Sequence, residues 1–102
     1  MIHVLATIRV AAGKRDEFLT EFRKLVPLVR AEQGCIEYGA AIDVPTTLPA
    51  QLPLRDDVVM VVEKWDDLDA LAAHLIAPHM LDYRARVKTL VLGTELQVLE
   101  PA

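Results

Sequence analysis

The chain of 102 residues has no serine and no asparagine, and it contains only four glycines and one cysteine. The absence of serine excludes serine-nucleophile hydrolysis and leaves six threonines as the alternative hydroxyl groups. Four scattered glycines cannot form a P-loop or a GxGxxG dinucleotide motif, so we expect no nucleotide cofactor. Cys35 cannot form an internal disulfide, and no spacing of Cys and His indicates structural zinc.

Charge and hydropathy exclude further classes. A net charge of −4 and a pI near 5.2 argue against a nucleic-acid surface, which normally needs a basic face. No apolar run approaches the roughly 18–20 residues that cross a bilayer, and the N-terminus lacks a signal-peptide pattern, so we expect a cytoplasmic protein. The 53% apolar content is high for a small monomer and favours burial between subunits.

The first half of the chain alternates between two periodicities. Residues 2–10 alternate apolar and less apolar positions, which predicts a strand. From Lys14 onward the period becomes helical, with Phe18, Phe22 and Val29 on one face, and Gly34 suits the turn that ends this helix. Residues 35–43 read as a second, weaker strand, because they include Gly39 and two alanines.

The second half begins with an irregular segment. Residues 44–56 hold three prolines and three leucines, so they form no regular element but have apolar groups to bury, a pattern typical of a lid or an interface arm. A β-branched run predicts a strand over 58–65, and Asp66 or Asp67 is expected to cap the next helix. Pro78 splits the helical region in two, Gly93 is expected to end it, and residues 94–99 form a short last strand.

This order predicts one α+β domain over residues 1–102, with the ferredoxin-like arrangement β-α-β-β-α-β. Its antiparallel sheet would carry helices on one face only. The strand at 58–65 is apolar on both faces, since Val58, Met60 and Val62 alternate with Val59 and Val61. We therefore expect a second copy to cover the bare face, which gives a homodimeric α/β barrel.

Most of the specialised side chains lie in one stretch, which holds the only tryptophan and two of the three histidines. Together with segments before it, this stretch resembles the antibiotic biosynthesis monooxygenase family, most closely its quinol monooxygenase branch. The resembling segments are Gly13-Lys14-Arg15 with Phe18, Glu32-Gln33-Gly34-Cys35 with Tyr38, Glu63-Lys64-Trp65, and residues 70–75 running into Pro78-His79-Met80. The resemblance implies oxygenation of a small quinol or polyphenol by O2, without metal or other cofactor, in a homodimer with a pocket between sheet and helices.

Such chemistry needs a base near neutrality and a dry apolar cavity. His74 is the expected catalytic base, at the edge of the stripe of Leu68, Leu71 and Leu75, where it would stay partly hydrated. The alternative is a boundary histidine bonded to a carbonyl or to Glu63. Glu63 is the second candidate for a catalytic role, orienting His74 or carrying a proton, and its alternative is a salt bridge to an arginine.

The expected substrate-binding residues are Trp65, Tyr38, His79, Val61 and Tyr83. Trp65 could stack on a planar substrate or fill the core, and Tyr38 could offer its hydroxyl or simply pack. His79, in the first turn after a proline, could be a neutral acceptor or a solvated surface group. Polyketide-oxidising members of the family place an asparagine at the position of Val61, so their polar network is not implied here.

Two other functions remain open from the sequence. An isomerase that moves protons on a small metabolite could use the same dimeric barrel, and Arg84 and Arg86 pointing to bulk water would weaken that reading. A binding module without catalysis is the other alternative. A pocket too small for a bicyclic ring, or one closed by the proline-rich segment, would favour it.

Overall fold

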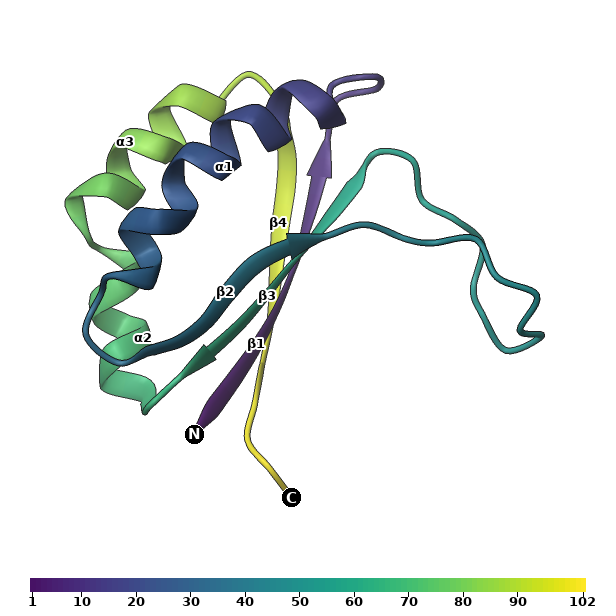
Figure 1. The fold of residues 1–102 in the computed structure, drawn as a ribbon. Coiled ribbons are helices and arrows are strands. Elements are labelled where there is room, and N and C mark those ends of the chain that lie inside the picture. The colour runs from purple at the N-terminus through teal and green to yellow at the C-terminus, as the bar shows by residue number, and fades with distance from the viewer.

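The computed structural model describes all 102 residues as a four-stranded antiparallel sheet with three helices on one face (Figure 1). The strands lie in the order β2-β3-β1-β4. This confirms the predicted α+β class and its ferredoxin-like order. The elements are β1 (Ile2–Val10), α1 (Arg15–Arg30), β2 (Cys35–Ala41), β3 (Val58–Trp65), α2 (Leu68–Leu75), α3 (Pro78–Val87) and β4 (Val91–Leu99).

Strand β1 forms the centre of the sheet and sets its two faces. Its even-numbered residues are buried under the helices, as the alternation predicted. Ala6 pairs with Val61 of β3 on one side and with Leu96 of β4 on the other. Because side chains alternate across a strand, these three residues share the helix-covered face and form part of one floor.

Helix α1 buries the predicted aromatic face. Phe18 and Phe22 are buried, and the ring of Phe22 stacks on Tyr38 of β2 with 5.5 Å between centroids. Gly34 adopts the expected positive φ, +85°. A Cβ at this glycine would lie 2.6 Å from the Cβ of Ala70, so the turn after α1 packs directly against α2.

Helix α2 begins as predicted but buries a different face. The Asp67 side chain caps it by accepting a hydrogen bond from the Ala70 backbone N–H at 2.8 Å. Leu68, expected on the apolar stripe, is exposed, whereas Leu71 and His74 are buried. The expected apolar face of α2 was therefore wrong at Leu68. This residue begins the helix directly after the Asp67 cap, and its side chain does not pack on the sheet.

The expected end of the second helical region was also wrong. Helix α3 ends at Val87, the Leu90 N–H bonds back to the Val87 carbonyl, and β4 begins at Val91. Gly93 is thus a strand residue opposite Arg9 of β1. The guanidinium of Arg9 occupies the space that a Cβ at position 93 would take. Hydrogen-bonded pairing with β1 extends the strand through Gly93. A glycine at this place in the sequence had predicted a helix end.

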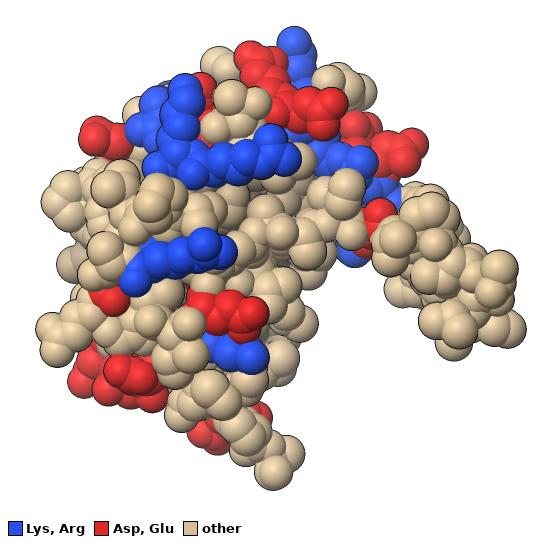
Figure 2. Space-filling view, in the orientation of Figure 1, with Lys and Arg blue, Asp and Glu red and all other residues tan.

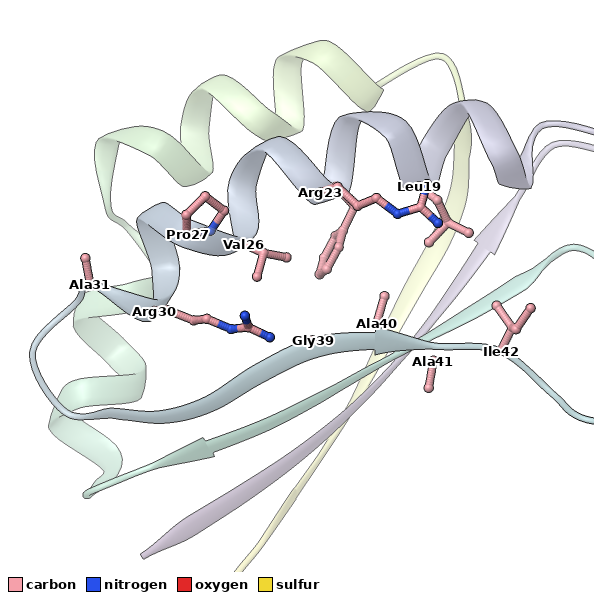
Figure 3. Close-up of a pocket in the computed structure, with 11 residues that line it drawn as sticks. Leu19, Arg23, Val26, Pro27, Arg30, Ala31, Gly39, Ala40, Ala41 and Ile42 are labelled. Atoms are coloured by element: carbon pink, nitrogen blue, oxygen red, sulfur yellow. The ribbon is translucent and has the colours of Figure 1, made fainter.

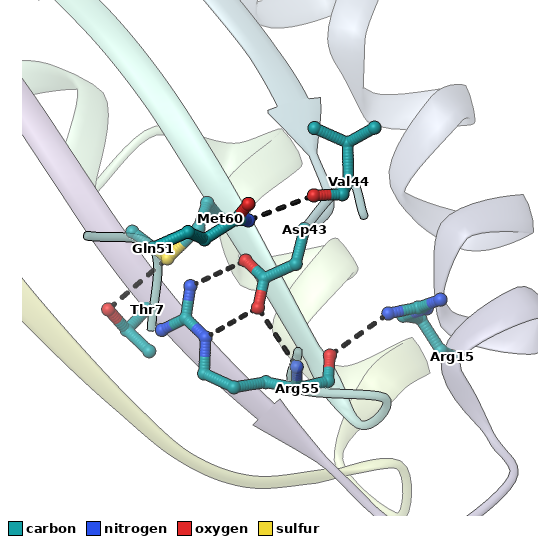
Figure 4. Close-up of polar contacts among 7 residues, drawn as sticks. All are labelled: Thr7, Arg15, Asp43, Val44, Gln51, Arg55 and Met60. Carbon is teal, nitrogen blue, oxygen red and sulfur yellow. Dashed lines mark hydrogen bonds and ion pairs between the residues drawn. The ribbon is translucent and has the colours of Figure 1, made fainter. Parts of the chain in front are cut away.

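Residues 43–55 form no helix or strand and project from the body as an arm (Figure 1). Its base is closed by Asp43 and Arg55, whose guanidinium makes two hydrogen bonds to the carboxylate at 2.8 and 2.9 Å (Figure 4). Between them, residues 44–54 carry no charge, and Figure 2 shows this uncharged lobe standing away from the charged body. No helix of the structure combines the length and apolar character needed to cross a membrane.

Candidate active site

A cavity of about 380 Å³ lies between the sheet floor and the helices. Its walls are mainly apolar, and its polar side chains are few. The sheet contributes Ala6, Ile8, Tyr38, Val61, Glu63, Val91, Thr94 and Leu96, and the helices contribute Phe22, His74, Leu75, Met80, Tyr83, Arg84 and Val87. This volume falls in the range of small-molecule pockets.

His74 of α2 points into this cavity from a buried position. Its side chain is only 1% exposed, so the expected partial hydration was wrong. The reason is that His74, rather than Leu68, lies on the face of α2 that packs on the sheet. Its ring lies 4.6 Å from the Trp65 ring and 5.4 Å from the Tyr38 ring, centroid to centroid. The imidazole is therefore held between aromatic side chains and cannot turn freely.

One carboxylate oxygen connects two histidines. Glu32, in the turn after α1, places Oε2 2.9 Å from His74 Nδ1 and 2.8 Å from His79 Nε2. An ionised carboxylate can only accept hydrogen bonds, so both of these nitrogens carry a hydrogen. In neutral His74 the remaining nitrogen, Nε2, is then bare. The hydrogen bond to Glu32 at Nδ1 thus sets the tautomer of the buried His74 imidazole.

Glu63 of β3 lies on the cavity side of His74. Its Oε1 accepts a hydrogen bond from Trp65 Nε1–H at 2.9 Å and lies 3.9 Å from His74 Nε2. The alternative of a salt bridge between Glu63 and an arginine is therefore wrong. Burial raises the pKa of Glu63 to about 7, the Trp65 hydrogen bond opposes this rise, and the nearby charge of Glu32 adds to it.

Burial also lowers the pKa of His74. The hydrogen bond that His74 makes to the Glu32 carboxylate opposes this change, because it favours the charged form of the imidazole. The charges of His79 and Arg84 lower it further. His74 is consequently a neutral base at neutral pH. Burial raises the pKa of Tyr38 and of Tyr83 well above the usual phenol value, so both phenols keep their hydrogens as possible donors.

The structure separates the expected substrate-binding residues into two groups. Tyr38, Val61 and Tyr83 line the cavity with His74 and Glu63. Trp65 and His79 do not line it. Trp65 is fully buried behind His74, where its N–H holds Glu63, and the 24%-exposed His79 lies beyond Glu32.

Glu32 is the residue of the site that the sequence analysis missed. In the sequence it stands out only as part of Glu32-Gln33-Gly34-Cys35, the segment at the turn that resembles the family, and no motif spacing relates it to histidines 42 and 47 residues away. The available signal was its position. Glu32 lies two residues before Gly34, in the turn after α1. Because this turn packs on α2, the Glu32 carboxylate is held close to α2.

A second, larger hollow of about 860 Å³ lies between α1 and β2 (Figure 3). Its lining is apolar except for Arg23 and Arg30, and Arg30 Nε–H donates to the Tyr38 carbonyl at 3.1 Å. It contains no carboxyl or imidazole group that could exchange a proton. Nowhere in the chain do three or more His, Cys, Asp or Glu side chains gather in a way that could hold a metal ion.

Comparison with known proteins agrees with this fold and shows the family of the chain. Residues 1–86 match the family model described as antibiotic biosynthesis monooxygenase. The chain is 37% identical to the probable quinol monooxygenase YgiN of Escherichia coli, covering 99% of this chain and 98% of that protein. It is 32% identical to the putative monooxygenase YcnE of Bacillus subtilis, covering 89% and 86%.

Among solved structures, the protein PA3566 from Pseudomonas aeruginosa superposes with a TM-score of 0.80 at 26% identity, covering 99% of this chain and 93% of that one. The family match extends over β1 to α3 and therefore includes every helix around the cavity. Both curated relatives span nearly the whole chain and carry monooxygenase names. The chain belongs to the antibiotic biosynthesis monooxygenase family.

Proposed function

We propose that this protein is a cofactor-independent monooxygenase that oxidises a small quinol or polyphenol with O2. The observation that carries the proposal is the pairing of His74 Nε2 and Glu63 Oε1, 3.9 Å apart, at a mainly apolar cavity. The separation is too long for a direct hydrogen bond, but a substrate oxygen can lie at about 2.8 Å from both atoms at once. A phenolic hydroxyl placed there contacts the bare nitrogen of the expected base.

The reaction follows from removing that hydrogen. His74 Nε2 takes the proton, and the phenolate that remains is electron-rich enough to transfer an electron to O2. The two radicals combine to form a carbon–oxygen bond on the ring. Loss of water from the resulting hydroperoxide leaves a hydroxylated quinone, so one quinol and one O2 give one hydroxyquinone and one water. Tyr38 and Tyr83 are donors in the same cavity for the negative charge that develops on oxygen.

We propose that the working unit is a homodimer formed through the sheet faces. The face of the sheet opposite the helices is covered by no element of the chain and presents Leu5, Thr7, Met60 and Val62 at its centre. The uncharged arm stands beside the body with Leu48 and Leu52 largely exposed. Burying such apolar surface contributes roughly 25 cal/mol per Å², which favours a second copy against this face.

One observation supports the isomerase alternative. Arg84 lines the cavity and forms no ion pair, whereas Arg86 binds Glu21 outside it. A single cation in a cavity that also holds the Glu63 carboxyl is a weak phosphate site. For the non-catalytic alternative, the expected signs are absent, because the cavity has small-molecule size and no residue of the segment 44–56 lines it.

We expect the chelator-treated protein to consume O2 with 1,4-dihydroxynaphthalene, and His74→Ala to lower kcat/KM by roughly 100-fold or more, the usual contribution of a general base. An oxygen electrode measures the rate above enzyme-free autoxidation. Mass analysis after reaction with ¹⁸O2 detects the added oxygen atom.

Lys24→Ala, at an exposed position of α1 outside the cavity, is the control for loss of a side chain. An unchanged rate in His74→Ala would remove His74 from the mechanism. Turnover of a keto substrate under argon, with no uptake of O2 from any quinol, would replace the oxygenase by the isomerase.

The ionisation of Glu63 predicts a pH-dependent stability. Because its pKa is raised from 4.5 to about 7 in the fold, its contribution is complete below pH 4.5 and is lost as pH rises through 7. The difference corresponds to about 3 kcal/mol. We expect the free energy of unfolding of Glu63→Gln, minus that of the unsubstituted protein, to rise by about this amount between about pH 4 and pH 8, as measured by urea unfolding. The glutamine side chain still accepts the hydrogen bond from Trp65.

The exposed Glu37→Gln is the matched control, because it removes one negative charge from the neighbouring strand β2. A Glu63→Gln stability difference that is the same at both pH values would show that the Glu63 carboxyl is not protonated on folding.

Leu5→Glu tests the dimer by placing a charge at the centre of the bare face. We expect the unsubstituted protein to have twice the monomer mass of 11.3 kDa and the variant to be monomeric, because an unpaired buried charge disfavours the interface. Sedimentation or light scattering measures the mass. Leu81→Glu, at an exposed position of α3, should stay dimeric. A monomeric unsubstituted protein would contradict this assembly.

A further inference from the structure

Four titratable side chains form an unbroken line from the cavity to the protein surface. The line runs from Glu63 to His74, Glu32 and His79, with successive contacts of 3.9, 2.9 and 2.8 Å. Exposure rises along it, from 1% for His74 to 14% for Glu32 and 24% for His79. The buried end faces the substrate cavity, and the other end reaches water.

The break between α2 and α3 brings the two histidines to the same oxygen. On a continuous helix, residues five positions apart are rotated by about 140° and face different ways. Here the chain leaves helical geometry at Ile76 and becomes extended at Ala77, with φ −61° and ψ 144°, before α3 starts at Pro78. His79, in the first turn of α3, is thereby directed back to the carboxylate that His74 already binds.

A buried base needs such a connection. Once His74 has taken a proton from a bound quinol, its Nε2 side is closed by the substrate and by apolar walls. An imidazolium in contact with the phenolate would return the proton before O2 reacts, so the extra proton must move away through the ring. The only other nitrogen of the ring, Nδ1, contacts Glu32.

Resting on the proposed function, we propose that Glu32 and His79 form the proton path between the active site and water, with His79 as the group that exchanges with water. This assigns His79 a positioning and relay role outside the cavity, in place of the substrate contact that the sequence suggested. It also explains why a polar cluster of three side chains is built between α1, α2 and α3, away from the substrate.

The proton balance is as follows. The O–H bond of the quinol breaks as a bond forms to His74 Nε2, and the Nδ1 hydrogen of His74 then moves to Glu32 Oε2. His79 exchanges its Nε2 hydrogen with water for one on Nδ1, which bares Nε2 to accept the hydrogen from Glu32. Loss of the Nδ1 hydrogen to water leaves His74 neutral, with its hydrogen on Nε2. The peroxide anion formed on the ring then takes the hydrogen from His74 Nε2, a hydrogen returns from water through His79 and Glu32 to His74 Nδ1, and the resting state is restored. One proton passes outward and one returns in each turnover, so the quinol and O2 still give hydroxyquinone and water, and no electrons move along the line.

His79→Gln tests the relay. The glutamine amide can still donate to Glu32 Oε2, but it cannot take up and release a proton. With 1,4-dihydroxynaphthalene at low buffer concentration, we expect kcat to fall about tenfold while KM changes less than about twofold, because only a proton-transfer step is slowed. Rising imidazole concentration should restore kcat in the variant and leave the unsubstituted protein unaffected.

Lys24→Gln, which removes an exposed titratable group of α1 outside the cavity, is the matched control and should match the unsubstituted protein at every imidazole concentration. A His79→Gln kcat that is unchanged at low buffer would overturn the proposal and indicate that Glu32 releases its proton directly. A loss that imidazole does not restore would also overturn it, because His79 would then act only by holding Glu32. Failure of the proposed function is distinct, since it appears as no His74-dependent O2 uptake in the unsubstituted protein, and it overturns both.

Discussion

The site depends on the single oxygen of Glu32 that is shared by His74 and His79. By accepting from His74 Nδ1–H, this oxygen holds the imidazole in one orientation and one tautomer. The bare Nε2 is thereby left facing the cavity beside Glu63. Without the contact, a buried neutral histidine could present either nitrogen, and the separation of base, carboxyl and substrate oxygen would not be defined.

The fold supplies this contact by joining three elements that are distant in sequence. The turn at Gly34 packs against α2 so closely that a Cβ there would overlap Ala70, which places Glu32 over the histidine. The helix break at residues 76–77 returns His79 to the same point. The sheet contributes the opposite wall, where Val61 and Ala6 form an apolar floor and Glu63 is the one carboxyl. Burial raises the pKa of Glu63 to about 7 and lowers the pKa of His74.

Sequence patterns predicted the elements well wherever a face is buried along its whole length. The alternation in β1 and the spacing of Phe18 and Phe22 in α1 report packing on a continuous apolar layer, so periodicity is sufficient. The end of α3 and the start of β4 could not be predicted in this way. A glycine at position 93 is typical of a helix end, but its pairing with Arg9 in the sheet makes it a strand residue.

The site was predictable in part for a similar reason. His74, Glu63, Tyr38, Val61 and Tyr83 lie on elements whose buried faces can be inferred, and all five line the cavity. Glu32 and the place of His79 depend on tertiary contacts between a turn and a helix break, which leave no periodic signal. Trp65 was expected at the substrate because it is large and aromatic. In the structure its ring packs behind His74 and its N–H is used to hold Glu63.

The tautomer of His74 tests the account most directly, because the proposed base is defined by the nitrogen that lacks a hydrogen. Nitrogen-15 NMR of the labelled imidazoles at neutral pH distinguishes the two neutral forms and the cation. The account predicts that His74 is neutral, with its hydrogen on Nδ1 and with Nε2 bare. A hydrogen on Nε2, or a fully protonated ring at neutral pH, would contradict it.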